Sequence, residues 1–235
     1  MPTTHLQAWR DRGRPRPAIV CDFGTRADFD ALAPLHYRAG PPATIDRIVR
    51  AIDTEHDALA GVLVTSRPTL NGSWRGRAWN DAFASGSRSA DARRINAQLR
   101  TISRVIVDPR FRGLGVGSGL VRHYLAAPAT RCTEAITALG DVCPFFERAG
   151  MRPVTIPCQP RNTRLLRALG TDDPMRAAET LVRQNEEFED ALRRWARTNA
   201  STRRLADGDV SLIATAAVGA MLAPPMAYVH GDPSA

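Results

Sequence analysis

A strand, a glycine-rich loop and a helix, in that order, constrain the fold of this chain more than any other stretch. The β-branched run from Val105 to Val107 ends at Asp108-Pro109, because proline lacks the N–H that a strand ladder needs. Glycines at 113, 115, 117 and 119 then allow the backbone to turn sharply. Apolar residues at helical spacing follow, namely Leu120, Val121, Tyr124 and Leu125. The loop thus presents N–H groups at a helix N-terminus, a geometry that suits a phosphate or pyrophosphate.

Two common phosphate-binding motifs are excluded by composition and spacing. A P-loop requires Gly-x-x-x-x-Gly-Lys-Ser/Thr, and this chain contains no lysine. The dinucleotide fingerprint Gly-x-Gly-x-x-Gly also fails, because Gly113-Leu-Gly115 is followed by Ser118, and Gly115-Val-Gly117 by Leu120. What remains is the pattern Arg112-x-x-Gly115-x-Gly117 directly after a strand.

This pattern resembles the acetyl-CoA pyrophosphate loop of the GNAT acyltransferase superfamily, Arg/Gln-x-x-Gly-x-Gly/Ala. A second segment, Phe145-Phe-Glu-Arg-Ala-Gly150-Met, is similar to the family's Phe-Tyr-Glu-Lys-x-Gly-Phe helix beside the coenzyme thiol. Between the two segments there is room for one helix and one strand, Thr133 to Leu139, as the family requires. The resemblance implies an α/β (α+β) fold, with a GNAT-like mixed, mostly antiparallel central sheet flanked by helices and a C-terminal helical extension.

The resemblance also implies an activity, a coenzyme and a set of site residues. The chain would be an N-acetyltransferase that moves acetyl from acetyl-CoA to an amine of unknown identity, without a metal. Backbone groups of Val105 and Val107 would pair with the pantetheine arm of the coenzyme. N–H groups of the loop would hold the pyrophosphate; this loop comprises Arg112, Gly113, Leu114, Gly115, Val116, Gly117 and Ser118.

Departures from the family's pattern concern proton transfer. Phe146 stands where many members carry the tyrosine that protonates the departing thiolate, and a phenyl ring cannot donate a proton. The usual asparagine ahead of that helix is not evident in residues 141–144, and strand 101–107 lacks the glutamate that often acts as base. We therefore take His36 and Tyr37 as candidate catalytic acid and base. The alternative is that His36 and Tyr37 only cap a helix and pack against the sheet.

The charge balance leaves an anionic partner open, and with it a second interpretation of function. The chain has 32 basic and 24 acidic residues, a net charge of +8, and every basic residue is an arginine, which binds phosphate well. His36-Tyr37-x-x-Gly40 is weakly similar to a motif of the phage Mom type of adenine-modifying GNAT-like proteins, which implies nucleic-acid base modification. A third interpretation is a non-catalytic CoA-binding or interaction domain, because Phe146 and the missing base remove the usual chemistry.

The order of patterns along the chain predicts its domains. We expect a loose N-terminal arm over residues 1–17, the acyltransferase domain over 18–158, and a helical extension over 159–235 in which 227–230 returns as a last strand. Thr44–Asp53 and Leu59–Thr65 predict a hairpin. A long loop insertion over 67–95 is rich in Gly, Ser, Arg and Asn, and either forms part of the acceptor side or is a mobile surface loop.

The extension is predicted to contain one long helix and one buried helix. Asp172-Asp-Pro174 starts the long one, whose apolar stripe extends to Trp195 and is interpreted as core or dimer surface. Leu212 to Ala223 is uncharged but too short to span a bilayer, so we interpret it as the buried helix. The four cysteines form no Cys-x-x-Cys pair, which argues against zinc and disulfides. With no signal-peptide pattern, a cytoplasmic location is expected; a homodimer remains open.

Overall fold

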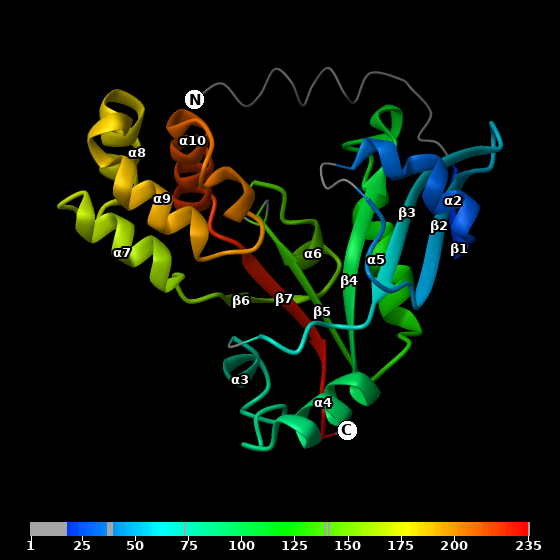
Figure 1. Cartoon of the computed structure of the whole chain (residues 1–235). Coiled ribbons are helices and arrows are strands. Elements are labelled where there is room, and N and C mark those ends of the chain that lie inside the picture. Colours follow the sequence, from blue (N-terminus) through cyan, green and yellow to red (C-terminus); the bar gives the residue numbers. More distant parts are fainter. Residues whose placement is uncertain (1–17, 37–39, 73, 139, 141, 235) are drawn as a thin grey trace. The chain divides into compact units, whose positions relative to one another are not determined.

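The computed structural model describes residues 18–36, 40–72, 74–138, 140 and 142–234 (Figure 1). The predicted arm over 1–17 and the candidate residue Tyr37 lie outside this part of the chain. The chain divides into two compact units. The first, called here the sheet unit, comprises described residues within 1–135, 145–152 and 228–235, and the second, the helical unit, those within 136–144 and 153–227.

A seven-stranded sheet forms the centre of the fold, in the order β1-β2-β3-β4-β5-β7-β6. β1 pairs with β2, β2 with β3 and β3 with β4 in antiparallel register, whereas β4 and β5 are parallel. The predicted mixed, mostly antiparallel sheet is therefore confirmed. The strands are β1 (Ile19–Phe23), β2 (Arg47–Asp53), β3 (Ala58–Ser66), β4 (Leu99–Val107), β5 (Cys132–Thr137), β6 (Arg152–Thr155) and β7 (Met226–Gly231).

Two helices, α2 (Arg26–Leu32) and α5 (Val116–Ala126), cover opposite faces of strand β3. Val62 of β3 packs in a core cluster with Phe29 and Leu32 of α2. A Cβ added to the neighbouring Gly61 would lie 3.2 Å from side-chain atoms of Val116 and Leu120 in α5. Successive residues of a strand face opposite sides, so the two helices lie on opposite faces. Gly61 allows the first turns of α5 to approach the sheet closely.

The insertion over 67–95, for which part of the acceptor side and a mobile surface loop were the two alternatives, contains helical segments. It contains α3 (Arg75–Ala78) and the start of α4 (Arg88–Gln98), which packs against β4. Trp74, Trp79 and Phe83 are buried, with the rings of Trp79 and Phe83 5.3 Å apart in an edge-on arrangement. The aromatic side chains therefore make this insertion a packed part of the sheet unit. The short helices of this unit are η1 (Ala33–Leu35), η2 (Pro109–Phe111) and α6 (Phe145–Arg148).

The helical unit has its own apolar core between four helices, which are α7 (Pro160–Ala168), α8 (Pro174–Gln184), α9 (Glu189–Arg197) and α10 (Val210–Leu222). Polar groups are also satisfied inside this core. The indole N–H of Trp195 donates to Asn162 Oδ1 at 2.8 Å, and Asn162 Nδ2 donates to the Ala220 carbonyl at 3.2 Å. These bonds join α7 to α9 and α10 in one packed body.

Two predictions for this unit are wrong. The long helix breaks at the 3₁₀ turn η3 (Asn185–Phe188), and its apolar stripe is not continuous, because Met175 and Val182 are 58% and 75% exposed. α10 is only partly buried, with Leu212 and Leu222 exposed at its two ends. None of the helices described here combines the length and the apolar character needed to span a bilayer.

Candidate functional site

The last residues of β4 present backbone groups on the edge that faces away from β3. The Asp108 N–H donates to the Ala60 carbonyl of β3 at 3.0 Å. Backbone groups of successive strand residues point to alternate edges, so those of Ile106 share the β3 edge and those of Val105 and Val107 the other. The Val107 carbonyl accordingly accepts a 3.2 Å bond from Arg112 Nε rather than from β3.

The pairing of β4 changes just before Val105. Its parallel register with β5 extends from Leu99 opposite Cys132 to Ile102 opposite Ala135. On the β3 side the register shifts at Ser103, because Thr65 pairs with Ile102 and the next residue, Val64, with Arg104. The Ser103 hydroxyl donates to the Val64 carbonyl at 3.1 Å, which satisfies a backbone group at the irregularity. Such bulges redirect strands next to binding sites.

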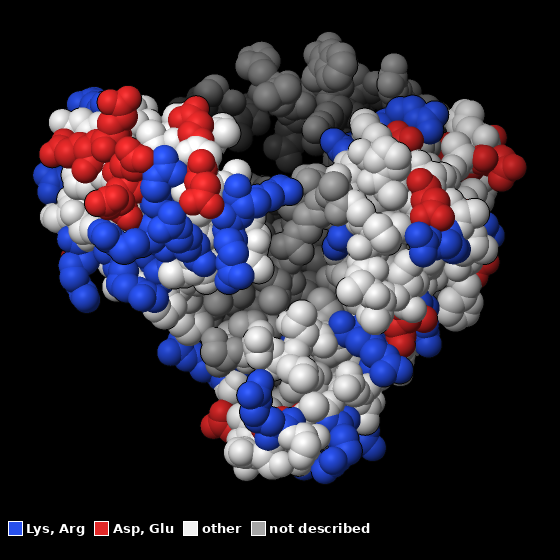
Figure 2. Space-filling model, in the orientation of Figure 1, with Lys and Arg blue, Asp and Glu red and all other residues white. Residues whose placement is uncertain are grey.

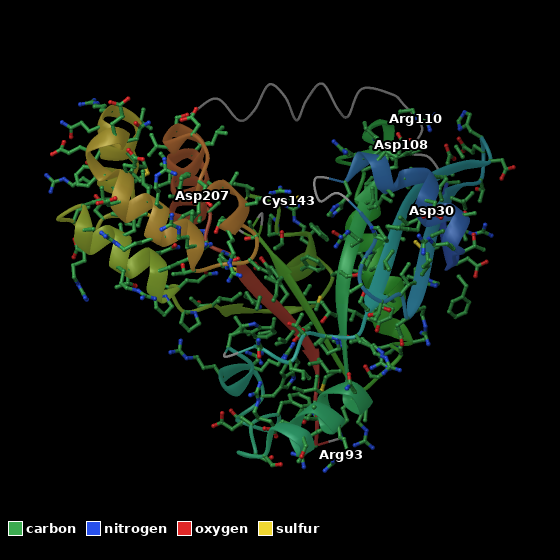
Figure 3. All side chains as sticks on the ribbon, viewed as in Figure 1. Asp30, Arg93, Asp108, Arg110, Cys143 and Asp207 are labelled. Atoms are coloured by element: carbon green, nitrogen blue, oxygen red, sulfur yellow. The ribbon has the colours of Figure 1, made fainter. Side chains whose placement is uncertain are left out.

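The loop after β4 begins with a rigid turn. The Asp108 carboxylate caps η2 by accepting from the Arg110 backbone N–H at 2.9 Å, and the Arg110 guanidinium returns to both carboxylate oxygens at 2.9 and 3.0 Å. Figure 3 shows the two side chains together beyond β4. These hydrogen bonds from Arg110 lower the pKa of Asp108. Arg110 is thus engaged by Asp108, and Arg112 is the loop's other arginine.

Two glycines then set the entry into α5. Gly113 and Gly115 have φ angles of 79° and 84°, the left-handed region that side chains other than glycine rarely adopt. Gly115 is the N-cap, and the first intrahelical bond joins the Gly119 N–H to its carbonyl at 2.9 Å. No described side chain caps this helix. The N–H groups of Val116, Gly117 and Ser118 therefore remain as donors at the positive end of α5.

The second predicted motif lies beside the first. A Cβ on Gly117 would lie 3.6 Å from Phe145 of α6 and 3.8 Å from Val107 of β4. Arg122 of α5 donates to the Arg148 carbonyl of α6 at 3.2 Å. The end of β4, the start of α5 and α6 therefore lie next to one another, beside the predicted coenzyme residues from Val105 to Ser118.

Phe146, at the position of the family's tyrosine, is buried and packed among aromatic rings. It is 5% exposed, and its ring centroid lies 4.2 Å from that of Phe145 and 5.2 Å from that of Tyr228 in β7. The Tyr228 hydroxyl donates to Glu147 Oε1 at 3.3 Å. The phenol group of Tyr228, from strand β7, thus lies next to Phe146, the position of the family's tyrosine.

His36 lines a pocket elsewhere in the sheet unit, at the end of η1. The pocket has a volume of about 440 Å³, and its described lining residues are Arg26, Phe29, Asp30, Ala33, Pro34, His36, Gly40 and Pro41. η1 contacts β4, and Arg104 of β4 donates to the Gly40 carbonyl at 3.4 Å. The pocket therefore lies beside η1, an element that contacts β4. Whether Tyr37 joins it lies outside the described residues.

One buried carboxylate on the sheet was missed by the sequence analysis. Glu134 of β5 accepts from Arg75 Nε at 2.8 Å and from Arg75 Nη2 at 2.7 Å. The Thr101 hydroxyl of β4 donates to Glu134 Oε1 at 2.7 Å. This arrangement occupies both carboxylate oxygens, so Glu134 fits an anchor for the insertion better than a general base. Arg75 and Glu134 are far apart in the sequence, and the residues around each of them give no local indication that the two side chains pair.

Within the described part of the chain, one group of side chains has the spacing of metal ligands: Asp53, Glu55 and His56, in the turn between β2 and β3. The buried Asp53 carboxylate lies 2.8 Å from His56 Nδ1 and accepts from the Glu55 N–H at 3.2 Å. These bonds are those of a carboxylate that closes a hairpin turn.

Comparison with known proteins places the chain near acetyltransferases of known structure. NAA60 of Arabidopsis thaliana in complex with acetyl-CoA is 15% identical, with a TM-score of 0.40, over 57% of this chain and 86% of that chain. Nourseothricin acetyltransferase is 15% identical, with a TM-score of 0.36, over 57% and 84%. AtaT complexed with acetyl-methionyl-tRNAfMet is 16% identical, with a TM-score of 0.34, over 59% and 89%. No protein-family model and no curated protein matches the chain.

The order of β4, glycine loop and α5 is the one that the sequence predicts, within a mixed sheet flanked by helices. The weaker similarity to the Mom type of adenine-modifying proteins stays a prediction.

Proposed function

We propose that this protein is an acetyl-CoA-dependent acyltransferase that transfers acetyl to an amine. The observation that carries the proposal is the loop from Arg112 to Ser118. There, two left-handed glycines lead into the N-terminus of α5, whose first N–H groups point out of the helix next to the edge of β4. A diphosphate is the coenzyme group that such a site would hold.

Charge and hydrogen bonding both support a diphosphate at this loop. The N-terminus of α5 carries a partial positive charge of roughly half a unit, and its N–H groups donate without a competing side chain among the described residues. Arg112 is tied through Nε to the Val107 carbonyl, and its two terminal nitrogens have no bond to any described residue. These nitrogens would pair with phosphate oxygens.

The edge of β4 would align the rest of the coenzyme. Backbone groups of Val105 and Val107 point away from β3, so an amide-containing pantetheine arm would pair with them as an additional strand does. In the transfer, the acceptor amine attacks the thioester carbonyl, a C–N bond forms and the C–S bond breaks. The amine loses one proton and the thiolate takes one up, so the net reaction needs no other reactant. Fixed positioning of the two reactants supplies much of the rate in such a scheme.

The acceptor would enter through the pocket at the end of η1. This pocket lies beside η1, which contacts β4, and among its described lining residues it contains His36, and histidine is the side chain that accepts a proton near neutral pH. His36 is therefore the proposed general base, with Tyr37 as a candidate acid. The identity of the amine stays open, because acceptor pockets of this kind are built from loops.

The first experiment tests the loop through charge alone. Leu114 precedes the N-cap of α5 and is 51% exposed, so neither glutamate nor glutamine at this position disturbs the core. The comparison is Leu114→Glu against Leu114→Gln, which differ only in charge. We expect the glutamate variant to bind CoA at least about 10-fold more weakly, although a carboxylate near a helix N-terminus stabilises the fold by about 0.3–1 kcal/mol. Calorimetry measures binding, and urea unfolding measures stability.

A second ligand separates the diphosphate from the thioester. S-acetylpantetheine lacks the diphosphate, so turnover of this substrate at saturating concentration should be the same in the two Leu114 variants. Equal CoA affinity in both variants would refute the assignment of the loop. Loss of affinity with the predicted gain in stability excludes misfolding as the cause.

The second experiment tests His36. His36→Ala should lower kcat with a panel of amines by about 10²–10⁴-fold, because general base catalysis contributes that much, while CoA affinity stays unchanged. Tyr37→Phe is tested in parallel. Unchanged kinetics in both variants would leave the two residues with a packing role. CoA binding without turnover of any amine by the unmodified protein would instead favour a non-catalytic CoA-binding domain.

A further inference from the structure

Arginines on the helical unit gather on three segments that the fold holds side by side. These segments are α7, α9 and the 3₁₀ turn η4 (Arg203–Leu205), and α9 contacts both of the others. Arg161 of α7 lies over the Trp195 ring of α9, 4.2 Å from its centroid, and donates to Thr202 at 2.9 Å just before η4. Burial lowers the pKa of Arg161. Arg161 is therefore part of the packing and fixes the three segments as one surface.

The arginines around this buried one are exposed. We define the arginine face as the exposed arginines of the three segments: Arg164, Arg167, Arg194, Arg197, Arg203 and Arg204. Arg197 pairs with Asp207 at 3.1 Å. For the other members of the face, no carboxylate of the described chain lies within ion-pair distance, and α7 has no acidic residue at all.

Most acidic residues of the same unit lie on other segments or at the far end of α9. They concentrate on α8, η3 and the first turn of α9, with Glu179, Glu186, Glu187, Glu189 and Asp190, whereas Asp207, the partner of Arg197, and Asp209 follow η4 in the sequence. Figure 2 shows this separation, with the arginine atoms of the unit grouped away from most of its carboxylates. The face therefore concentrates positive charge that the rest of the unit does not neutralise.

We propose that the arginine face binds double-helical nucleic acid through its phosphate backbone. Guanidinium groups pair with phosphate oxygens in a bidentate geometry, and a duplex carries about one negative charge per 1.7 Å of its axis. This binding site belongs to the helical unit and the coenzyme loop to the sheet unit, and the proposal does not depend on the proposed acyltransferase activity.

The composition of the face favours a duplex over other polyanions. A membrane surface or a folded protein partner requires exposed apolar anchors, and the exposed large apolar residues of this unit lie outside α7, α9 and η4: Ile136, Val142, Met175, Val182, Leu212 and Leu222. A single strand is normally held by stacking on aromatic rings, and Trp195, the aromatic residue of α9, is buried. Contacts to phosphates alone predict binding that depends strongly on salt and little on sequence.

The experiment compares two charge-matched pairs of substitutions in the full chain. Arg164→Gln/Arg167→Gln removes two charges from the face, and Arg176→Gln/Arg183→Gln removes two exposed charges from α8. Fluorescence anisotropy with 20-base-pair RNA and DNA duplexes measures affinity from 50 to 200 mM salt. The face variant should bind at least about 10-fold more weakly at 100 mM salt, and its slope of log K against log salt should fall by about 1.8, two contacts at about 0.9 each. In the control variant, the slope should fall by less than half of the change expected for the face variant.

Four further measurements complete the test. The single strands of the same sequences should bind more weakly than the duplexes, and shuffled duplexes equally well. CoA affinity should be the same in both variants, which separates this proposal from that of the coenzyme loop. Equal duplex affinity in the two variants would overturn the proposal, as would tighter binding to vesicles containing anionic lipid than to either duplex.

Discussion

The buried pair between Arg75 and Glu134 offers the sharpest test of how the insertion is held. Arg75 is 4% exposed and donates two hydrogen bonds to the Glu134 carboxylate and a third to the Thr69 carbonyl at 2.6 Å. Arg75→Met keeps the side-chain volume roughly but leaves a buried carboxylate without its cation. Removing one partner of such a pair costs about 3–5 kcal/mol, mostly because the remaining charge is unpaired.

A double variant distinguishes a stranded charge from lost packing. In Arg75→Met/Glu134→Leu the carboxylate is also removed, so the large penalty disappears. The Thr101 hydroxyl and the Thr69 carbonyl each lose one bond, at about 0.5–1.5 kcal/mol each. The double variant should therefore unfold at a free energy about 1–3 kcal/mol below the original protein, and above that of Arg75→Met alone.

Urea unfolding, followed by tryptophan fluorescence and circular dichroism, measures these free energies. Trp74 lies under the Arg75 guanidinium, with 5.7 Å between the charged carbon and the ring centroid, so its fluorescence reports the anchor directly. The control is Arg77→Met, the same substitution on an exposed residue of α3, with an expected effect within about 0.5 kcal/mol. If Arg75→Met costs less than 1 kcal/mol, or if the double variant is the less stable of the two, the pair does not anchor the insertion.

Three other predictions follow from single positions. Gly115→Ala should destabilise the fold by about 1–2 kcal/mol, because φ is 84° there, whereas Gly119→Ala, whose added Cβ meets no atom within 4 Å, should stabilise α5 by about 0.5–1 kcal/mol in urea unfolding. Burial raises the pKa of Cys132 to about 11, whereas an unfolded thiol has a pKa of about 8.5. Between these two values the thiol ionises in the unfolded state only, so the urea midpoint should fall as the pH rises from about 8.5 to about 11, and it should fall less in Cys132→Ala. Tyr228→Phe removes the bond to Glu147 and should cost about 0.5–1.5 kcal/mol of stability without changing kcat.

The features that the sequence predicted correctly depend on residues that are close to one another in the sequence. The β4 strand, its proline stop and the helix that follows the loop are each encoded within a few positions, and α5 begins at Val116, so that it includes Gly117 and Gly119. Local signals also predicted the β2–β3 hairpin. In each case the pattern and the tertiary contacts favour the same structure.

What the sequence could not predict depends on distant partners. The insertion resembles an exposed loop because arginine is normally exposed, and Arg75 is buried only through Glu134, 59 residues further along the chain. The predicted long helix failed for a related reason. Its apolar spacing continued through residues 185–188, but the chain turns there at η3, and α8 and α9 enter the same core as two separate helices, with Met175 and Val182 facing solvent.

Phe146 shows where a motif stops determining a mechanism. The family's tyrosine at this position would protonate the leaving thiolate, and here the nearest phenol belongs to Tyr228, which stacks on Phe146 from β7. Tyr228 is fully buried and its hydroxyl is already bonded to Glu147, so it supports the ring cluster and does not face a substrate. The proton released by the amine must then reach the thiolate by another route. In the proposed mechanism, His36 of the pocket beside η1 would take the proton from the amine, and solvent would protonate the thiolate.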